Sequence, residues 1–332
     1  MTRRIAINGF GRIERGVLRV LLERDIDLEM IAVNDLTNGK MLAHLLEWDS
    51  VYGRLRRKIS FADGELHVDD LRIKVFAEPD PAKLPWGELG IDVVLESTGR
   101  FTDAKDARRH IEAGAKRVLV SAPATNADLT VVRGVNDDLF DPEVHQIVSN
   151  ASCTTNAFAP LAKVLDDLAG IEQGFMTTVH AYTQDQNLID GPHKDPRRAR
   201  AAALNIVPTS TGAAKAIGLV LPKLDGKLSG TSMRVPVPVG SIVELNAAVS
   251  REVTREEILE AYRTAAGGEL KGILEFSDEP LVSSDIVGNS HSSIFDSELT
   301  EVLGKHVKVT SWYDNEWGFS NRAAEMLEKL AQ

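Results

Sequence analysis

A single cysteine and a histidine offer the most reactive chemistry in this sequence. Cys153 is the only cysteine, and it stands between Ser152 and Thr154 just before an apolar helical pattern. A helix N-terminus favours a thiolate through its free backbone N–H groups and its dipole, so Cys153 is a candidate nucleophile. His180 ends an extended run and could face the start of that helix as the activating base. The spacing leaves open the alternative that a lone cysteine only fills a buried apolar site.

A pair of glycines near the N-terminus is typical of a turn that binds a dinucleotide. Gly9 and Gly11 lie between an apolar run and a helical pattern, where they permit a tight turn and a close approach to a pyrophosphate. Asp35 ends the next apolar run, where a carboxylate can accept hydrogen bonds from a ribose and would repel a 2′-phosphate. Glycines alone could form an ordinary turn, and Asp35 alone a helix cap. Together they predict NAD as the cofactor.

Glu14 occupies the third position of this motif, where glycine or alanine normally allows a helix and a strand to pack closely. Two interpretations stay open. Either the side chain escapes to solvent or the helix shifts slightly, with no effect on function, or the carboxylate weakens or changes NAD binding. Comparing the NAD affinity of the wild type with that of Glu14→Gly separates the two.

The composition bounds the class of protein. The chain has 332 residues, of which 43% are hydrophobic and 26% charged, and this indicates a globular protein of two domains. A net charge of −11 argues against a general nucleic-acid binder. One cysteine excludes an intramolecular disulfide, and no apolar run has the length of a signal peptide or a membrane span. We therefore predict a cytoplasmic protein with no membrane partner, no nucleic-acid partner and no metal site.

The first half alternates short apolar runs with helical patterns, which is typical of a parallel, doubly wound α/β sheet. The expected strands are residues 4–8, 28–34, 93–96, 117–121 and 147–149, and the expected helices are residues 10–22 and 104–113.

The second half favours longer strands with few helices between them, which indicates an α+β domain with a mainly antiparallel sheet. The expected strand regions are residues 174–180, 229–245 and 307–312, and the expected helices are residues 154–168, 254–265 and 321–330. We predict a dinucleotide-binding domain over residues 1–150 and a catalytic domain over residues 151–317. The sequence leaves open whether the final helix, about residues 318–332, packs back onto the first domain.

Four segments together resemble one enzyme family. They are residues 8–13 (NGFGRI), 149–156 (SNASCTTN), 178–183 (TVHAYT) and 312–318 (WYDNEWG). The chain resembles the phosphorylating, NAD-dependent glyceraldehyde-3-phosphate dehydrogenases of bacterial type over essentially its whole length. The resemblance implies a Rossmann-type first domain and oxidation of glyceraldehyde 3-phosphate, with inorganic phosphate, to 1,3-bisphosphoglycerate. It also implies a hemithioacetal and then a thioester on Cys153, with His180 as the base.

The resemblance also assigns binding residues. Those for NAD are Gly9, Gly11, Arg12, Ile13, Asp35, Ser121 and Asn315. Those for the substrate's C3 phosphate are Thr183, Arg198 and Arg234, and those for the attacking phosphate are Ser152, Thr154, Thr211 and Gly212. Hydroxyls, backbone N–H groups and arginine side chains are the donors that such anions need. The resemblance further implies a homotetramer, in which residues 183–204 lie at a subunit interface.

One further departure concerns the nucleophile. Ala157 stands where the family usually has a second cysteine, one helical turn after Cys153. A local disulfide under oxidation is therefore excluded, and we predict that peroxide inactivates by oxidising Cys153 directly.

Other functions remain to be weighed. Erythrose-4-phosphate dehydrogenase shares the fold and the nucleophile, but the segment His180–Thr183 looks like the glyceraldehyde-3-phosphate type. A non-catalytic binding role would be favoured by loss of Cys153 or His180, and both are present. A semialdehyde dehydrogenase would lack the block at residues 313–316. The phosphate dependence of NADH formation with each sugar separates the first two enzymes.

Overall fold

The computed structural model describes residues 3–24 and 26–332, and these form two compact units. The first unit comprises Met1–Val131, Leu139–Ala151 and Ser320–Gln332, and the second comprises Val132–Asp138 and Ser152–Phe319. The C-terminal helix α9 (Trp317–Leu330) begins in the second unit and continues in the first. The predicted first domain also includes residues 1, 2 and 25, which lie outside the described residues.

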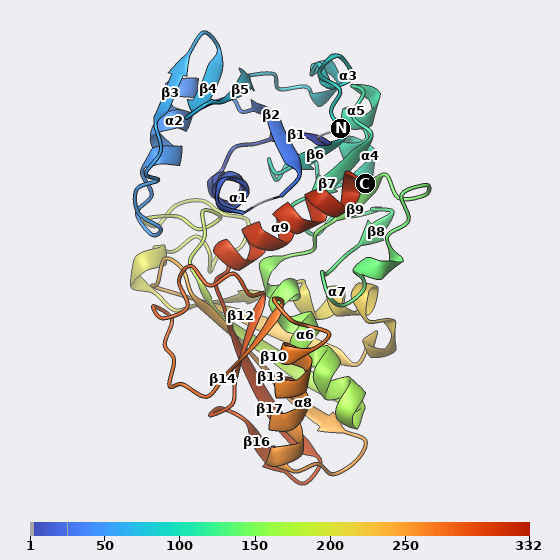
Figure 1. Cartoon of the computed structure of the whole chain (residues 1–332). Coiled ribbons are helices and arrows are strands. Elements are labelled where there is room, and N and C mark those ends of the chain that lie inside the picture. Colours follow the sequence, from blue (N-terminus) through green and yellow to red (C-terminus); the bar gives the residue numbers. More distant parts are fainter. Residues whose placement is uncertain (1–2, 25) are drawn as a thin grey trace. The chain divides into compact units, whose positions relative to one another are not determined.

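The first unit is built on a mainly parallel sheet (Figure 1). In spatial order its strands are β3 (Ile59–Ala62), β4 (Glu65–Val68), β5 (Leu71–Phe76), β2 (Leu28–Asn34), β1 (Arg3–Asn8), β6 (Val93–Glu96), β7 (Arg117–Val120), β9 (Ile147–Ser149) and β8 (Leu129–Thr130). Strands β3 to β5 pair antiparallel, and the pairs from β5 through β2 and β1 to β8 are parallel. The predicted doubly wound α/β fold is confirmed.

Strand β1 lies at the centre of this sheet, between β2 and β6. Its residues Ile5, Ala6 and Ile7 are fully buried. A strand covered on both faces is encoded by a continuous apolar run rather than an alternating one, as its sequence shows. The glycine turn follows at the carboxyl end of β1, the edge at which parallel sheets bind ligands.

Besides α9, the first unit has helices of four to twelve residues. They are α1 (Arg12–Glu23), α2 (Gly39–Glu47), α3 (Trp86–Leu89), α4 (Ala104–Ala107) and α5 (Arg109–Glu112). Helix α1 packs closely against α9, because a Cβ on Gly16 would lie 2.5 Å from Oγ of Ser320. That hydroxyl donates to the carbonyl of Ile13 at 3.2 Å. The first unit is therefore closed by a helix from the end of the chain.

The second unit contains a mainly antiparallel sheet, as predicted. Its strands in spatial order are β11 (Val207–Ser210), β12 (Leu228–Val235), β10 (Ile171–Ala181), β13 (Ser241–Val249), β17 (His306–Tyr313), β15 (Ser293–Asp296) and β14 (Leu274–Ser277), with β16 (Glu301–Leu303) paired to β17. The pairs β10–β12 and β14–β15 are parallel, and the remaining pairs are antiparallel.

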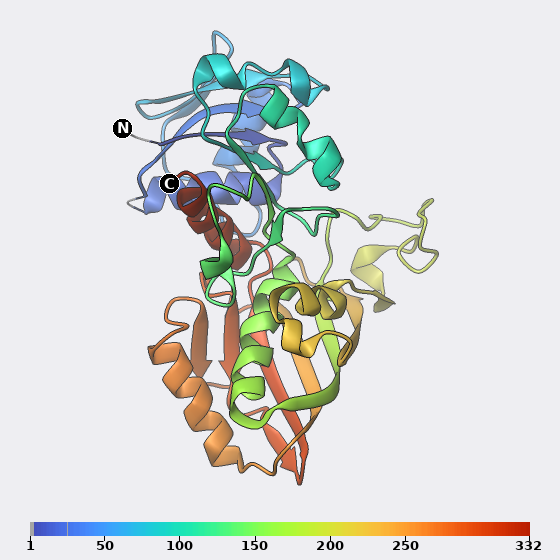
Figure 2. The ribbon, with the colours of Figure 1, turned by 90° about the vertical axis from the view of Figure 1, so that its right-hand side faces the viewer.

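Helices α6 (Cys153–Ala169), α7 (Ala213–Val220) and α8 (Arg255–Gly267) belong to the second unit, and Figure 2 shows α6 and α8 running along the sheet. Helix α8 starts with a capping box, in which Thr254 and Glu257 satisfy each other's backbone N–H groups. Along β10 the side chains alternate, so Met176, Thr178 and His180 are buried. The alternation puts His180 on the same face of the sheet as Thr178.

Several predicted elements have different bounds. The region 229–245 is two strands, because Pro236 and Pro238 lack the N–H that a ladder requires and Gly240 has a positive φ of 94°. The predicted helix 104–113 is divided into α4 and α5 at Arg108, whose backbone stays helical. Strands β3 to β5 were not predicted, although Leu71, Ile73 and Val75 alternate with Arg72 and Lys74 in β5, the pattern of a half-buried strand.

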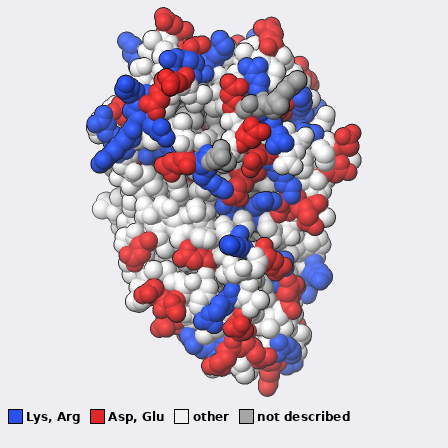
Figure 3. All heavy atoms as spheres, viewed as in Figure 1, with Lys and Arg blue, Asp and Glu red and all other residues white. Residues whose placement is uncertain are grey.

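Charged side chains of both signs are interspersed on the face seen in Figure 3. Exposed charged side chains of the chain also form ion pairs, for example Arg54 with Glu47 at 2.7 Å and Arg57 with Asp69 at 3.2 Å. Such exposed pairs add little stability each. Among the described residues, no helix is both long enough and apolar enough to cross a membrane.

Candidate active site

The nucleophile and base predicted from the sequence lie side by side. Cys153 is the first residue of α6, and its Sγ is 3.4 Å from Nε2 of His180 on β10. Ser152 caps the helix by accepting from the N–H of Thr155 at 3.1 Å. The preceding residue, Ala151, has a positive φ of 55°, which a residue with a Cβ rarely adopts. A strained turn thus delivers the sulfur to a helix N-terminus.

The second ring nitrogen of His180 is held by the backbone. Nδ1 lies 2.7 Å from the carbonyl oxygen of Ala181, which also accepts from Nη1 of Arg234 at 3.0 Å. Nη1 of Arg234 also lies 2.5 Å from Nδ1. In the tautomer whose Nδ1 donates to Ala181, Nε2 keeps its lone pair towards Cys153, and this is the tautomer that can act as the base. Strands β10 and β12 are parallel neighbours with His180 opposite Arg234, and this register sets the contact.

Burial and the charge of Arg234 together shift the pKa values of both reactive groups. Burial, and after it the Arg234 guanidinium, lowers the pKa of His180 to about 3. Burial raises the pKa of the Cys153 thiol, whereas Arg234 and hydrogen bonds from Thr154 lower it. The net shift keeps Cys153 as a thiol, with Arg234 opposing the rise of its pKa, beside an uncharged imidazole that can accept a proton.

Tyr313 is a residue of the site that chemical patterns in the sequence did not single out. Its hydroxyl lies 3.0 Å from Oγ1 of Thr154 and 2.8 Å from Oγ1 of Thr178, and all three residues are buried. Its ring meets that of His180 edge to face, with centroids 5.8 Å apart. The tyrosine therefore ties the start of α6 to β10 and packs against the base. Its place in the segment 312–318 was the signal that could have found it.

The predicted substrate-phosphate residues have distinct surroundings. Nε of Arg234 is buried and has no hydrogen-bond partner among the described residues, which suits an anion. Arg198 is already bound, because it donates to Asp185 and, at 2.9 Å, to Thr209. Thr183 follows β10, and its N–H donates to the side chain of Gln186 at 3.4 Å. Arg234 therefore keeps a donor available for a phosphate, whereas the donors of Arg198 are shared with Asp185 and Thr209.

The predicted residues for attacking phosphate lie at two helix starts. Ser152 and Thr154 begin α6. Gly212 is the N-cap of α7 and provides no side-chain cap, and the hydroxyl of Thr211 accepts from the N–H of Ala213 at 3.2 Å. Helix starts bind anions through free N–H groups and the dipole.

The glycine turn of the first unit has the geometry that a dinucleotide requires. Gly9 has a φ of 90°, and a Cβ there would lie 2.9 Å from backbone atoms of Ser97 and Thr98. Gly11 is the N-cap of α1 and offers no side-chain cap. Any larger residue at Gly9 would be strained and would clash, so glycine is required there.

The other predicted NAD residues of the first unit surround this turn. One carboxylate oxygen of Asp35 accepts from the N–H of Phe10 at 2.9 Å, so the acid is tied to the glycine turn itself. Ser121 follows β7, and its hydroxyl donates to that of Ser97 at 2.9 Å. Arg12 forms an ion pair with Asp49 at 3.0 Å. These residues therefore gather at the carboxyl ends of the parallel strands.

A buried polar network that the sequence patterns do not predict supports this edge. Asn8 donates to Glu96 at 2.6 Å, and Asn34 donates to Asn8 at 2.7 Å. His110 lies 2.9 Å from the same Glu96 oxygen, and Trp86 donates to Nδ1 of His110 at 2.9 Å. The network fixes the last residues of β1, β2 and β6 relative to one another. No local pattern reveals pairs that are so far apart in the sequence.

Asn315 belongs to the second unit, where its amide is oriented by two hydrogen bonds. Its Oδ1 accepts from the N–H of Gly240 at 3.2 Å and from the hydroxyl of Ser241 at 2.9 Å. The amide nitrogen therefore points away from these donors. Among the described residues, no cluster of His, Cys, Asp or Glu has the arrangement of a metal site.

Glu14 does not point to solvent, and that interpretation of its sequence position is wrong. The side chain is 4% exposed, and its Oε2 lies 2.9 Å from where a Cβ on Gly11 would stand. Burial raises the pKa of Glu14 to about 7, against hydrogen bonds from its own N–H, from Ser97 and from Gly11 that lower it. The carboxylate therefore folds back over the start of its own helix.

Comparison with known proteins agrees with this geometry. Family models of glyceraldehyde 3-phosphate dehydrogenase match residues 3–104 (NAD binding domain) and 152–315 (C-terminal domain). The glyceraldehyde-3-phosphate dehydrogenase of Kitasatospora aureofaciens is 71% identical over 99% of both chains. Glyceraldehyde-3-phosphate dehydrogenase 1 of Streptomyces avermitilis and the enzyme of Mycobacterium avium are 59% and 58% identical over 98% of both chains. The chain belongs to the glyceraldehyde 3-phosphate dehydrogenase family.

Membership of this family confirms the predicted resemblance and the predicted fold, and it makes the chain an NAD-dependent dehydrogenase. The cofactor fits the observed turn, because Gly9 leaves room for a close backbone approach and Asp35 lies beside it. Glu14 is the one feature of that turn that does not suit a pyrophosphate.

Proposed function

We propose that this chain oxidises D-glyceraldehyde 3-phosphate to 1,3-bisphosphoglycerate with NAD and inorganic phosphate, in glycolysis or gluconeogenesis. The observation that carries the proposal is the 3.4 Å separation of Cys153 Sγ and His180 Nε2 at the start of α6. A sulfur with an adjacent base at a helix N-terminus is equipped to form a covalent intermediate with an aldehyde.

The sulfur of Cys153 bonds to the aldehyde carbon, and His180 passes the thiol proton to the carbonyl oxygen, which gives a hemithioacetal. Nε2 of His180 then accepts the hydroxyl proton as the carbon loses a hydride and becomes a thioester. The chemistry that NAD supplies when bound is acceptance of that hydride. A phosphate oxygen attacks the thioester carbon, and the departing Cys153 sulfur recovers the proton from His180. The backbone N–H of Cys153 and the imidazolium stabilise the oxyanion.

The binding residues divide between cofactor and phosphates. We assign NAD to Gly9, Gly11, Arg12, Ile13, Asp35, Ser121 and Asn315. We assign the C3 phosphate to Thr183, Arg198 and Arg234, and the attacking phosphate to Ser152, Thr154, Thr211 and Gly212. The unpartnered Nε of Arg234 supports the first phosphate site, and the open start of α7 supports the second. The hydroxyl of Thr154 is shared with Tyr313, so a phosphate there joins an existing network.

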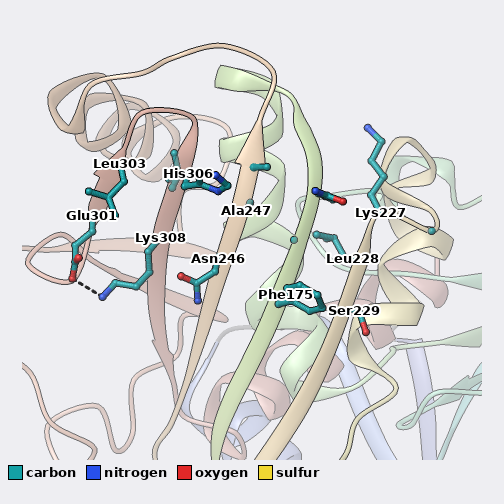
Figure 4. A pocket seen from close by; sticks show the side chains of 15 residues that line it. Phe175, Lys227, Leu228, Ser229, Asn246, Ala247, Glu301, Leu303, His306 and Lys308 are labelled. Carbon is teal, nitrogen blue, oxygen red and sulfur yellow. Dashed lines mark hydrogen bonds and ion pairs between the residues drawn. The ribbon is translucent and has the colours of Figure 1, made fainter.

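The proposal includes a cytoplasmic homotetramer. The sheet face opposite Met176 and His180 exposes Phe175 by 71% and Leu303 by 77%. A hollow of about 500 Å³ opens on that face, and Figure 4 shows Phe175 and Leu228 beside it. The segment 183–206 also exposes large apolar side chains, among them Leu188, Ile189, Leu204 and Ile206. Large exposed apolar side chains in such numbers are typical of subunit interfaces. Light scattering of the purified chain measures the assembly, and a monomeric mass would contradict the tetramer.

A spectrophotometric assay of NADH formation tests the activity. We expect reduction of NAD with glyceraldehyde 3-phosphate that depends on inorganic phosphate, little reduction of NADP, and complete loss of activity in Cys153→Ser. A rate that is independent of phosphate and higher with erythrose 4-phosphate would favour the alternative dehydrogenase. Absence of turnover with either sugar, in protein that still binds NAD, would favour a binding role.

A further inference from the structure

Glu14 closes the end of α1 at which a dinucleotide phosphate is expected to bind. Oε2 of Glu14 lies 2.9 Å from where a Cβ on Gly11 would stand, and the N–H groups of Gly11 and of Glu14 itself and the Ser97 side chain lower its pKa, so these donors face the carboxylate. Gly11 supplies no side-chain cap, so these are donors that the helix otherwise presents to an anion. The chain thus provides its own anion at this position.

A pyrophosphate and this carboxylate carry the same sign of charge and compete for the same donors. The charged groups around this end of the helix are Arg12, Arg15, Asp35, Asp49 and Glu96. Arg12 is engaged by Asp49 at 3.0 Å, and Glu96 lies 2.9 Å from His110. Asp35 adds a further negative charge beside Phe10. Arg15 is the cation that lowers the pKa of Glu14, and it does so less than burial raises it.

The side chain has little room to leave. It is 4% exposed and enclosed by Gly11 and Ser97, with the rest of α1 packed against α9 through Gly16. Neutralisation in place therefore costs less rearrangement than movement of a charged group into solvent. A protonated carboxyl could moreover donate a hydrogen bond to a phosphate oxygen.

We propose that Glu14 determines cofactor affinity in this chain: its carboxylate lies beside the pyrophosphate position at the start of free α1, and NAD binds with uptake of one proton from solvent onto that carboxylate. The inference rests on the NAD binding proposed above. It makes Glu14 a residue of the cofactor site whose charge opposes the ligand.

The expected pH dependence follows from the state of Glu14 in the free chain. Its pKa is about 7, so the carboxyl is mainly protonated at pH 6 and mainly ionised at pH 8. If only the protonated form binds NAD, the Kd rises about tenfold from pH 6 to pH 8. At pH 8 the binding of each NAD takes up about 0.9 proton by the same relation.

Isothermal titration of the full chain with NAD at pH 6, 7 and 8, in buffers of different ionisation enthalpy, measures both quantities. In Glu14→Gln we expect an affinity near the wild-type value at pH 6, no dependence on pH and no proton uptake. Glu23→Gln removes the same charge from the exposed far end of α1 and serves as the matched control, with wild-type behaviour expected.

Two outcomes would overturn the inference. Wild type and Glu14→Gln could share one pH dependence, or the wild type could release a proton, which would mean that the carboxylate moves out to solvent. If Glu14→Gln does not fold, Glu14→Gly replaces it with the same expectations. Absence of NAD binding in every variant at every pH would overturn the cofactor assignment itself, a failure distinct from the first two.

Discussion

Arg234→Met should raise the pKa of His180 and of Cys153 together. The pKa of His180 lies at about 3 against an ordinary value of 6.5, and burial is a larger cause than Arg234. Burial is unchanged in this variant, so the pKa of His180 should rise above about 3 and stay below 6.5. The Cys153 thiol should also ionise at higher pH, because Arg234 lowers its pKa.

Two measurements on the full chain check this result. An NMR titration of labelled histidine rings, with the signal assigned through His180→Asn, gives the pKa of the base. The pH dependence of alkylation by iodoacetamide gives the pKa of the only thiol. Arg200→Met removes an exposed arginine paired to Asp190 and should change neither value. Unchanged titration of both groups in Arg234→Met would refute the argument that this arginine lowers the pKa values of both.

Three further predictions concern stability, cofactor binding and oxidation. Tyr313→Phe removes two buried hydrogen bonds to threonine hydroxyls and should lower the free energy of unfolding by about 1–3 kcal/mol in urea, whereas an unchanged midpoint would contradict the network. Gly9→Ala should weaken NAD binding at least about tenfold by calorimetry, since a Cβ meets backbone at 2.9 Å, and Gly64→Ala, with a φ of 79° and open space around it, is the control. Peroxide should inactivate by oxidising Cys153, because Ala157 offers no partner thiol, and mass spectra of inactive protein with an intact thiol would disprove this.

Local patterns were sufficient to predict the fold class and the glycine turn. The run before Gly9 is continuous because β1 is covered on both faces, and the position of Asp35 follows from the end of β2. These signals act over a few residues, so a single sequence displays them. The individual roles of the binding residues remain predictions.

Contacts between residues that are distant in the sequence could not be predicted from local patterns. The contact of Arg234 with His180 arises because two strands that are distant in the sequence run parallel. The pairing of Glu96 with His110 joins a strand end to a helix, and no spacing rule indicates it. The direction of the Glu14 side chain was also beyond the sequence, because it depends on free space near Gly11 and Ser97.

The chain passes repeatedly between its two units, and this has a consequence for dissecting the protein. A fragment ending at Ala151 would contain the glycine turn but would lack Ser320–Gln332. That segment supplies Ser320 against Gly16 and Glu325 to Arg24 at 2.8 Å.

Truncation would also remove the carbonyl of Leu330, to which Arg117 donates at 2.7 Å. A contiguous N-terminal fragment would therefore expose the apolar side of α1 to water and should aggregate. The first unit therefore cannot be transferred to another protein as one continuous segment of the chain. Moving it into another protein would require the final helix to be joined back through a linker, in the manner of a circular permutation.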